Sequence, residues 1–175
     1  MGSRMNIIKF TLLIIILAKF GFVGAAPVAK DSQPSNLDFP EIKYIGSLSR
    51  ESQLAFREGK VLLLYVSRPN CPYCEKLKND VLFPLIRGGR FDEKMILREI
   101  SLNDGSVAGF DNKLATANEI LANYEIVGTP TLLFLGENGH ELTEKLSGYF
   151  SKDFYWSYFE NAINRAYKKL RDLSS

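Results

Sequence analysis

Residues 61–77, VLLLYVSRPNCPYCEKL, place two cysteines three positions apart shortly after a long apolar run. The run at 61–67 shows no alternation of polar and apolar residues, which is typical of a strand covered on both faces by helices. A short turn at 68–70 follows, and a helix is expected to begin at Cys71-Pro72, where proline suits the first turn. This passage from strand through turn to helix is the basis for interpreting the rest of the chain.

Strands and helices are expected to alternate on both sides of this stretch. The N-terminal half is predicted to hold an extended segment at 42–45, a helix at 50–58 capped by Ser49, the strand at 61–67, and a helix from Cys71 that Pro84 and Gly88-Gly89 break. The C-terminal half is predicted to hold a strand at 95–102, a loop at 103–112, a helix at 114–124, strands at 131–135 and 141–147 around a hairpin turn at 136–139, and a last helix that Ser151 caps and that ends near Leu170. Alternation implies right-handed crossovers between parallel strands. The expected fold class is therefore α/β, with three layers (α/β/α) and a central mixed sheet.

The composition is that of an ordinary globular protein, with 46% hydrophobic and 24% charged residues. The formal net charge is +2, but Arg4, Lys9 and Lys19 lie within residues 1–25, which contain no acid. From Ala26 onward, 19 basic residues stand against 20 acidic ones. This balance provides no basic field for a polyanion, so no nucleic-acid partner is expected.

The N-terminal residues have the pattern of an export signal. Basic residues precede and interrupt an apolar stretch, and Val23-Gly24-Ala25 supplies the small residues that a cleavage site needs. We therefore predict a signal peptide at 1–25, a linker at 26–40 and one domain at 41–175. An uncleaved signal anchor is the alternative, because the apolar stretch nearly reaches the length that crosses a bilayer. Export would place the cysteines in an oxidising compartment.

The candidate chemistry lies in the cysteine pair. A spacing of three at a helix start puts both sulfurs on one face of the first turn, where a disulfide can form and break with little backbone movement. The free N–H groups and the dipole of the helix would stabilise a thiolate at Cys71. A disulfide between Cys71 and Cys74 that only stabilises the structure is the alternative. It would close a very short loop, so it would remove little conformational entropy from the unfolded chain. The case for a zinc site is weaker still, because such a site needs four ligands. Beyond the two cysteines, only His140 could add a Cys or His ligand.

A second motif follows some 56 residues later, where Thr129-Pro130 stands immediately before a predicted strand. A CxxC after the second strand, an X-Pro bond opening the strand after the third helix, and a final hairpin and helix resemble the thioredoxin superfamily. The resemblance covers residues 42–170. It implies that the Pro130 peptide bond is cis and faces the disulfide, and that Thr129 offers its backbone to an extended substrate.

The resemblance also implies roles for the four residues of the CPYC motif. Cys71 would attack a substrate disulfide, and Cys74 would resolve the mixed disulfide. Pro72 and Tyr73 would contact the substrate. The Pro-Tyr dipeptide is similar to that of glutaredoxins, whereas the export signal is more similar to that of periplasmic thioredoxin-related reductases.

Several positions depart from the superfamily pattern. Asn70 stands where thioredoxins usually have tryptophan, and Tyr65 stands where they have a buried acid. Glu99, in the neighbouring strand, is the candidate that could relay the proton of Cys74; the alternative is a charge that leans out at a sheet edge. Gly88-Gly89 is not where glutaredoxins hold their glutathione-binding glycines, so glutathione binding is not supported. The loop at 103–112 is expected to border the substrate groove.

The export signal and the resemblance together thus predict an exported thiol:disulfide oxidoreductase, which the resemblance implies to be a reductase of periplasmic protein disulfides. It would use the redox-active disulfide without another cofactor or a metal, and a membrane electron donor would recharge it. The alternatives are a redox-inert binding module and a dedicated electron donor to a single partner protein. The expected location is the periplasm or the exterior, or the inner membrane if the signal remains uncleaved.

Overall fold

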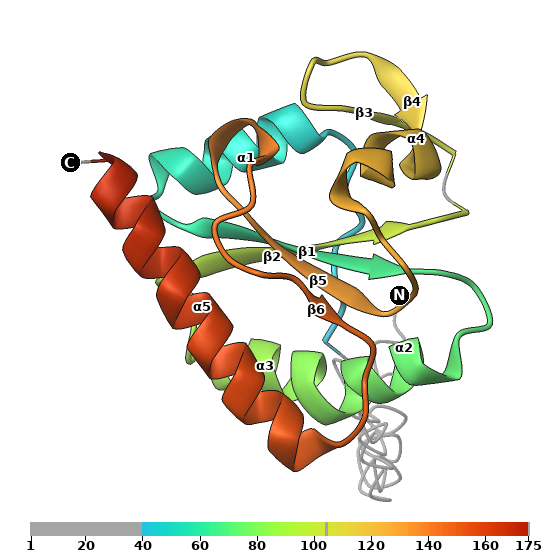
Figure 1. The fold of residues 1–175 in the computed structure, drawn as a ribbon, viewed down its shortest axis with the longest axis vertical. Helices are drawn as coiled ribbons and strands as arrows, with labels where there is room; N and C mark the ends of the chain where they lie inside the picture. Colours follow the sequence, from blue (N-terminus) through green and yellow to red (C-terminus); the bar gives the residue numbers. More distant parts are fainter. Residues whose placement is uncertain (1–39, 104, 175) are drawn as a thin grey trace, which may run out of the picture. The chain divides into compact units, whose positions relative to one another are not determined.

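The computed structural model describes residues 40–103 and 105–174 (Figure 1). The predicted signal segment at 1–25 and nearly all of the predicted linker at 26–40 lie outside the described residues. The elements are α1 (Leu48–Arg57), β1 (Val61–Ser67), α2 (Pro72–Leu77), the π-helix η1 (Lys78–Leu82), α3 (Phe83–Gly88), β2 (Met95–Ser101), β3 (Ser106–Ala108), β4 (Leu114–Thr116), α4 (Ala117–Leu121), the 3₁₀ turn η2 (Ala122–Tyr124), β5 (Thr131–Leu135), the 3₁₀ turn η3 (Glu137–Gly139), β6 (Leu146–Ser147) and α5 (Lys152–Ser174).

The central sheet has the strand order β2-β1-β5-β6. Strand β1 runs parallel to β2, with Tyr65 opposite Glu99, and antiparallel to β5, with Tyr65 opposite Leu132. The predicted segment at 42–45 pairs with β2 only through the parallel bridge of Tyr44 to Glu99. The prediction of a mixed sheet is confirmed.

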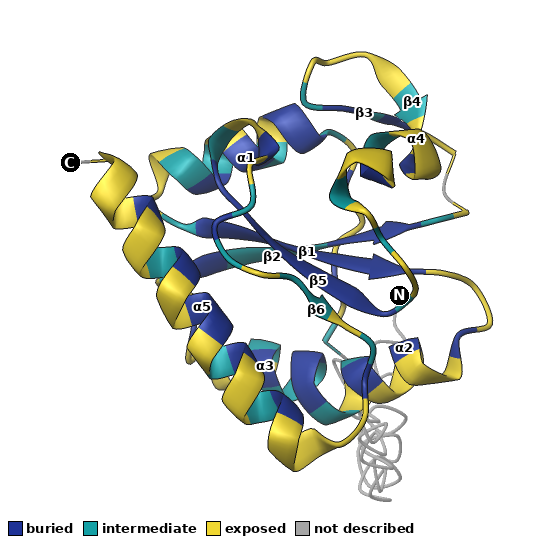
Figure 2. Ribbon diagram, viewed as in Figure 1, coloured by how far each residue is buried: buried dark blue, intermediate teal, exposed yellow. Residues whose placement is uncertain are grey.

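Helices cover both faces of this sheet, as Figure 1 shows. Alternate residues of β1 divide between two buried clusters, with Leu63 and Tyr65 on one face and Leu62 and Leu64 on the other. The first face packs against α2, α3 and α5, and the second against α1 and α4. Strands β1 and β5 are buried along their whole length (Figure 2), which is why β1 shows no polar alternation. The predicted three-layer α/β fold is therefore confirmed.

The helix after β1 continues through Pro84, so the prediction that this proline breaks it is wrong. A π-helical turn at Lys78–Leu82 precedes the proline, and the Phe83 N–H bonds to the Lys78 carbonyl five residues back. Pro84 lies near the start of α3, where the wider turn tolerates its missing N–H. The helix ends at Gly89, whose φ of 60° is left-handed and suits glycine.

The first helix begins two residues before the predicted start. Its cap is Ser47 rather than Ser49, because the Ser47 side chain accepts the Arg50 N–H. Ser49 is buried within the helix, and its hydroxyl accepts a hydrogen bond from Gln53 Nε2.

Residues 103–124 differ most from the predicted loop and helix. Strands β3 and β4 form a two-stranded antiparallel sheet of their own. Helix α4 starts only at Ala117, because Thr116 and Glu119 form a reciprocal capping box. Leu114, the first residue of the predicted helix, lies instead on β4 and is 73% exposed.

The C-terminal hairpin is antiparallel as predicted but shorter. Within the expected strand at 141–147, only a bridge at Glu141 and the two residues of β6 pair with β5. Helix α5 extends beyond the predicted end to Ser174. No helix in the described part of the chain is both long enough and apolar enough to cross a membrane.

Candidate functional site

Cys71 and Cys74 form a disulfide where β1 leads into α2. Cys71 is the N-cap residue of the helix, and its Sγ accepts the Cys74 N–H at 3.2 Å. Both cysteines are largely buried, whereas Pro72 and Tyr73 between them are exposed. The predicted pair is therefore joined, and the backbone N–H that meets Cys71 Sγ is the kind of donor that stabilises a thiolate.

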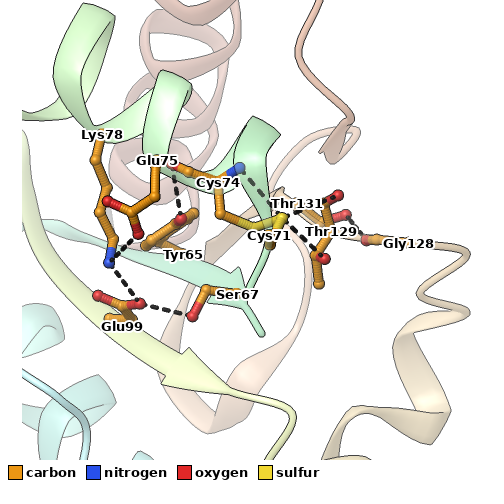
Figure 3. The surroundings of a disulfide bond; sticks show 10 residues. All are labelled: Tyr65, Ser67, Cys71, Cys74, Glu75, Lys78, Glu99, Gly128, Thr129 and Thr131. Atoms are coloured by element: carbon orange, nitrogen blue, oxygen red, sulfur yellow. Dashed lines mark hydrogen bonds and ion pairs between the residues drawn. A yellow bond between two sulfur atoms is a disulfide. The ribbon is translucent and has the colours of Figure 1, made fainter. Parts of the chain in front are cut away.

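The segment before β5 faces this disulfide. The Thr129–Pro130 peptide bond is cis. Cys71 Sγ lies 3.5 Å from Thr129 Oγ1 and 3.8 Å from the Thr129 carbonyl oxygen (Figure 3). Two hydrogen bonds hold the segment in place: Thr131 Oγ1 donates to the Gly128 carbonyl at 2.8 Å, and the Gly148 N–H donates to the Pro130 carbonyl at 2.8 Å. Two motifs 58 residues apart in the sequence thus meet at the sulfur of Cys71.

Tyr65 lies beneath the disulfide, completely buried. Its hydroxyl donates to the Cys74 carbonyl at 3.2 Å. Burial raises the pKa of Tyr65, and the negative charge of Glu99 raises it further. The phenol therefore stays neutral at physiological pH and acts as a hydrogen-bond donor that holds the backbone of Cys74.

Glu99 is 2% exposed and is not a charge leaning out at a sheet edge. Its Oε1 accepts a hydrogen bond from Ser67 Oγ at 2.6 Å and lies 3.2 Å from Lys78 Nζ (Figure 3). Burial lowers the pKa of Lys78, but the charge and hydrogen bond of Glu99 together with the charge of Glu75 outweigh burial, so this pKa is raised overall. Lys78 also lies 3.5 Å from Glu75 and faces the ring of Tyr65.

Sequence reasoning missed Ser67 and Lys78 as partners of Glu99. The signal for Lys78 was its spacing, because positions three and seven residues after Cys71 fall on the same side of a helix. Ser67 and Glu99 lie on the same face of paired strands, two positions apart in register. That register could not be read from the sequence.

Two pockets border the residues of the site, one at Thr129 and the other at Lys78 and Glu99. A groove of about 550 Å³ is lined by Arg68, Leu102, Asn118, Leu121, Ala122, Glu125, Ile126, Val127, Gly128 and Thr129. Its wall includes Leu102 and residues of α4, and none of the described residues of the loop at 103–112 is among the lining residues. A second cavity of about 340 Å³ is lined by Pro40, Glu41, Ile42, Tyr44, Phe83 and the ion pair of Lys78 with Glu99.

No group of three or more His, Cys, Asp or Glu side chains within residues 40–103 and 105–174 is arranged to hold a metal ion. His140 lies in the turn after β5, with its Nδ1 2.6 Å from the Glu137 carbonyl oxygen.

The fold and the CxxC disulfide at a helix start together define a thioredoxin-like protein. The chain belongs to the thioredoxin-like family, because residues 49–163 match the family described as "Thioredoxin-like domain". It is 26% identical over 129 residues to the thiol:disulfide interchange protein DsbD of Tatumella citrea. That match covers 73% of this chain but only 20% of the relative.

Solved structures support the fold. A thioredoxin from Thermus thermophilus superposes with a TM-score of 0.51 at 18% identity, covering 70% of this chain and 87% of that one. The DsbH oxidoreductase superposes with a TM-score of 0.50 at 16% identity, covering 77% of this chain and 94% of that one. At these identities the likeness concerns the fold alone.

Proposed function

We propose that this protein is an exported reductase of protein disulfides in the periplasm, and that Cys71 and Cys74 carry the reaction. The observation that carries the proposal is the position of Cys71 Sγ, which accepts a backbone N–H and lies 3.5 Å from Thr129 Oγ1. A sulfur held in this way can become a stabilised thiolate beside a segment that binds the substrate. The likeness to a thiol:disulfide interchange protein supports the reaction type.

In the proposed reaction, the Cys71 thiolate attacks one sulfur of the substrate disulfide and forms a mixed disulfide, while the other substrate sulfur leaves as a thiolate. The Cys74 thiolate then attacks Cys71 Sγ, and the substrate departs as a second thiolate. Two electrons pass from the enzyme dithiol to the substrate, and the enzyme ends as the disulfide seen here. A membrane electron donor would return the two electrons.

Substrate positioning is assigned to the residues around the disulfide. Thr129 and Pro130 would align an extended substrate segment beside Cys71, with which Thr129 is in contact. Pro72 and Tyr73 are exposed between the cysteines, where an incoming polypeptide would touch them. Tyr73 in particular is 59% exposed.

Glu99 is proposed to accept the proton of Cys74 before the resolving step. Tyr65 stands at the position where thioredoxins place a buried acid, so the proton must go elsewhere. The cavity of about 340 Å³ at Glu99 and Lys78 offers room for the water molecules that a relay needs. Lys78, 3.2 Å from Glu99, would hold the carboxylate in place between turnovers.

The relay is tested by following the resolving step against pH in Glu99→Gln. The variant should resolve a preformed mixed disulfide more slowly near neutral pH, with an altered pH profile and an unchanged rate of the first attack. Glu75→Gln is the matched control, because Glu75 also faces Lys78 but is exposed. An unaltered pH profile of resolution in Glu99→Gln would exclude this role.

The reaction direction is tested by the equilibrium reduction potential of the Cys71–Cys74 pair, titrated against glutathione and dithiothreitol buffers. A value near about −270 mV, typical of thioredoxin, would support a reductase, and a value near about −120 mV would reverse the direction. A pair that does not cycle would leave a redox-inert binding module.

The range of substrates is tested with Cys74→Ala, in which the mixed disulfide accumulates because the resolving thiol is missing. Many trapped proteins would support a general reductase, whereas one trapped protein would indicate a dedicated electron donor. Cys71→Ala serves as the control, since it lacks the attacking sulfur and should trap none.

A further inference from the structure

The groove of about 550 Å³ reaches the reactive disulfide through a single residue, Thr129. Thr129 lines the groove and also lies 3.5 Å from Cys71 Sγ through its hydroxyl. A substrate whose sulfur meets Cys71 can therefore extend its neighbouring residues into this groove. Which side chains it accepts depends on what the groove presents.

Much of the lining of the groove is apolar. Leu121 is buried on α4, Leu102 and Ile126 are partly buried, and Val127 at the rim is 88% exposed. An exposed valine beside the segment that faces the disulfide offers apolar surface that a partner can cover. The groove therefore suits an aliphatic side chain near the substrate cysteine.

Two opposite charges stand on the walls of the groove. Arg68 lies in the turn between β1 and Cys71, and Glu125 follows the turn η2 with a left-handed φ of 48°. They are the only Lys, Arg, Asp or Glu side chains in the described lining. Both are exposed, so neither is needed to satisfy a buried partner.

Neither charge has an ion-pair partner among the side chains of residues 40–103 and 105–174. Other cations near the sheet are paired: Lys78 lies 3.2 Å from Glu99, and Arg98 lies 2.8 Å from Glu51. Arg68 stands three residues before Cys71 in the chain and lines the same groove as Thr129. Its guanidinium can form two parallel hydrogen bonds with a carboxylate.

We infer that Arg68 determines substrate choice, and that the groove binds polypeptide disulfides with an acidic residue beside the cysteine and an aliphatic residue next to it. This inference rests on the proposed disulfide exchange and names its substrate class. The acidic side chain pairs with Arg68, the aliphatic one covers the apolar lining, and Glu125 repels a further acidic side chain. Substrates with a basic residue beside the cysteine react more slowly.

The test uses four symmetrical disulfides of blocked tetrapeptides. In the first pair the residue before the cysteine is either Glu or Lys, and in the second pair the residue after the cysteine is either Glu or Lys. The two peptides of a pair are otherwise identical. The reduced protein reacts with each peptide in a single turnover. Two peptide thiols are released for each enzyme disulfide formed, so electrons balance whatever the physiological direction. Peptide thiol is measured by chromatography, and each rate is divided by the rate of free dithiothreitol with the same peptide.

The wild-type protein should prefer the Glu peptide over the Lys peptide by about fivefold in at least one pair, the size of effect that exposed ion pairs produce. Arg68→Gln should abolish the preference, and Arg68→Glu should reverse it. Because the ratio of two substrates is read, a change in the thiolate pKa of Cys71 would cancel. The exchanged variant Arg68→Glu/Glu125→Arg keeps the net charge and should still show the reversed preference.

Lys76→Glu is the matched control, since Lys76 is an exposed cation of α2 outside the groove. It should leave the ratio of the two rates within about twofold of the wild-type ratio. Equal rates with all four peptides, or an equal change of the ratio in Lys76→Glu and Arg68→Glu, would overturn the inference and leave the proposed exchange intact. No reaction with any peptide would overturn the proposed function and this inference with it.

Discussion

Replacing Lys78 by methionine removes the cation that pairs with the buried carboxylate of Glu99. The two charges lie 3.2 Å apart, which corresponds to about 5 kcal/mol at an effective dielectric constant near 20. Part of this attraction offsets the cost of taking both ions from water. Removing one partner of such a pair usually destabilises a protein by about 3–5 kcal/mol. We expect Lys78→Met to lower the free energy of unfolding by about 3 kcal/mol.

Replacing Glu99 by glutamine while Lys78 stays should lower the free energy of unfolding by less. Glutamine at position 99 can still accept the hydrogen bond of Ser67, and Lys78 keeps Glu75 as a second partner at 3.5 Å. The side chain of Lys78 is 16% exposed, so it can also turn its ammonium toward water. We therefore expect about 2 kcal/mol for Glu99→Gln, and about 3 kcal/mol for the double variant, since the second replacement no longer breaks a pair.

The assay is urea unfolding of the oxidised protein at pH 7, followed by circular dichroism and by the fluorescence of Trp156. This single tryptophan packs edge-on against Phe159, so its emission should change on unfolding. The two single variants and the double variant should give a coupling energy of about 2 kcal/mol. Lys76→Met, at an exposed lysine of the same helix, should change stability by less than about 0.5 kcal/mol.

Two results would refute this reasoning. A coupling energy below about 0.5 kcal/mol would mean that Lys78 and Glu99 do not depend on each other in the folded protein. A larger loss for Glu99→Gln than for Lys78→Met would contradict the order that follows from the second partner of Lys78.

Three further predictions concern stability. Replacing the completely buried Phe159 by alanine should lower the free energy of unfolding by about 3–5 kcal/mol, measured by urea unfolding. Burial and a hydrogen bond to Asp80 raise the pKa of Tyr149 to about 12. The folded state therefore favours the neutral phenol, and this stability is complete below about pH 10 and falls as the pH rises towards about 12. Tyr149→Phe should show a shallower loss of stability over that range, and an unchanged slope would contradict it. Gly139 has a φ of 83°, and Gly139→Ala would place a Cβ 2.5 Å from the ring of Phe110. Thermal unfolding should therefore show that the free energy of unfolding falls by about 2 kcal/mol or more. A fall below about 0.5 kcal/mol would show that the ring moves aside.

Much of the fold follows from local patterns. The apolar run of β1 and the proline at the first turn of α2 are preferences of short segments, and both elements appear where they were predicted. The errors lie where a neighbouring segment overrides such a preference. Pro84 stays helical because a π-turn precedes it, and residues 114–116 pair with β3 instead of starting a helix.

The candidate site divides in the same way. The sequence contains the CxxC of Cys71 and Cys74 and the Thr129-Pro130 pair, because the chemistry of these motifs depends on residue type and spacing. Strand register and the rotation of the α2–η1 helix decide that Glu99 is buried against Lys78. Only the packing of α4 beside the turn at Arg68 forms the groove that Thr129 lines. Local preferences act within a few residues, whereas these contacts join segments tens of residues apart and exist only once the core has formed.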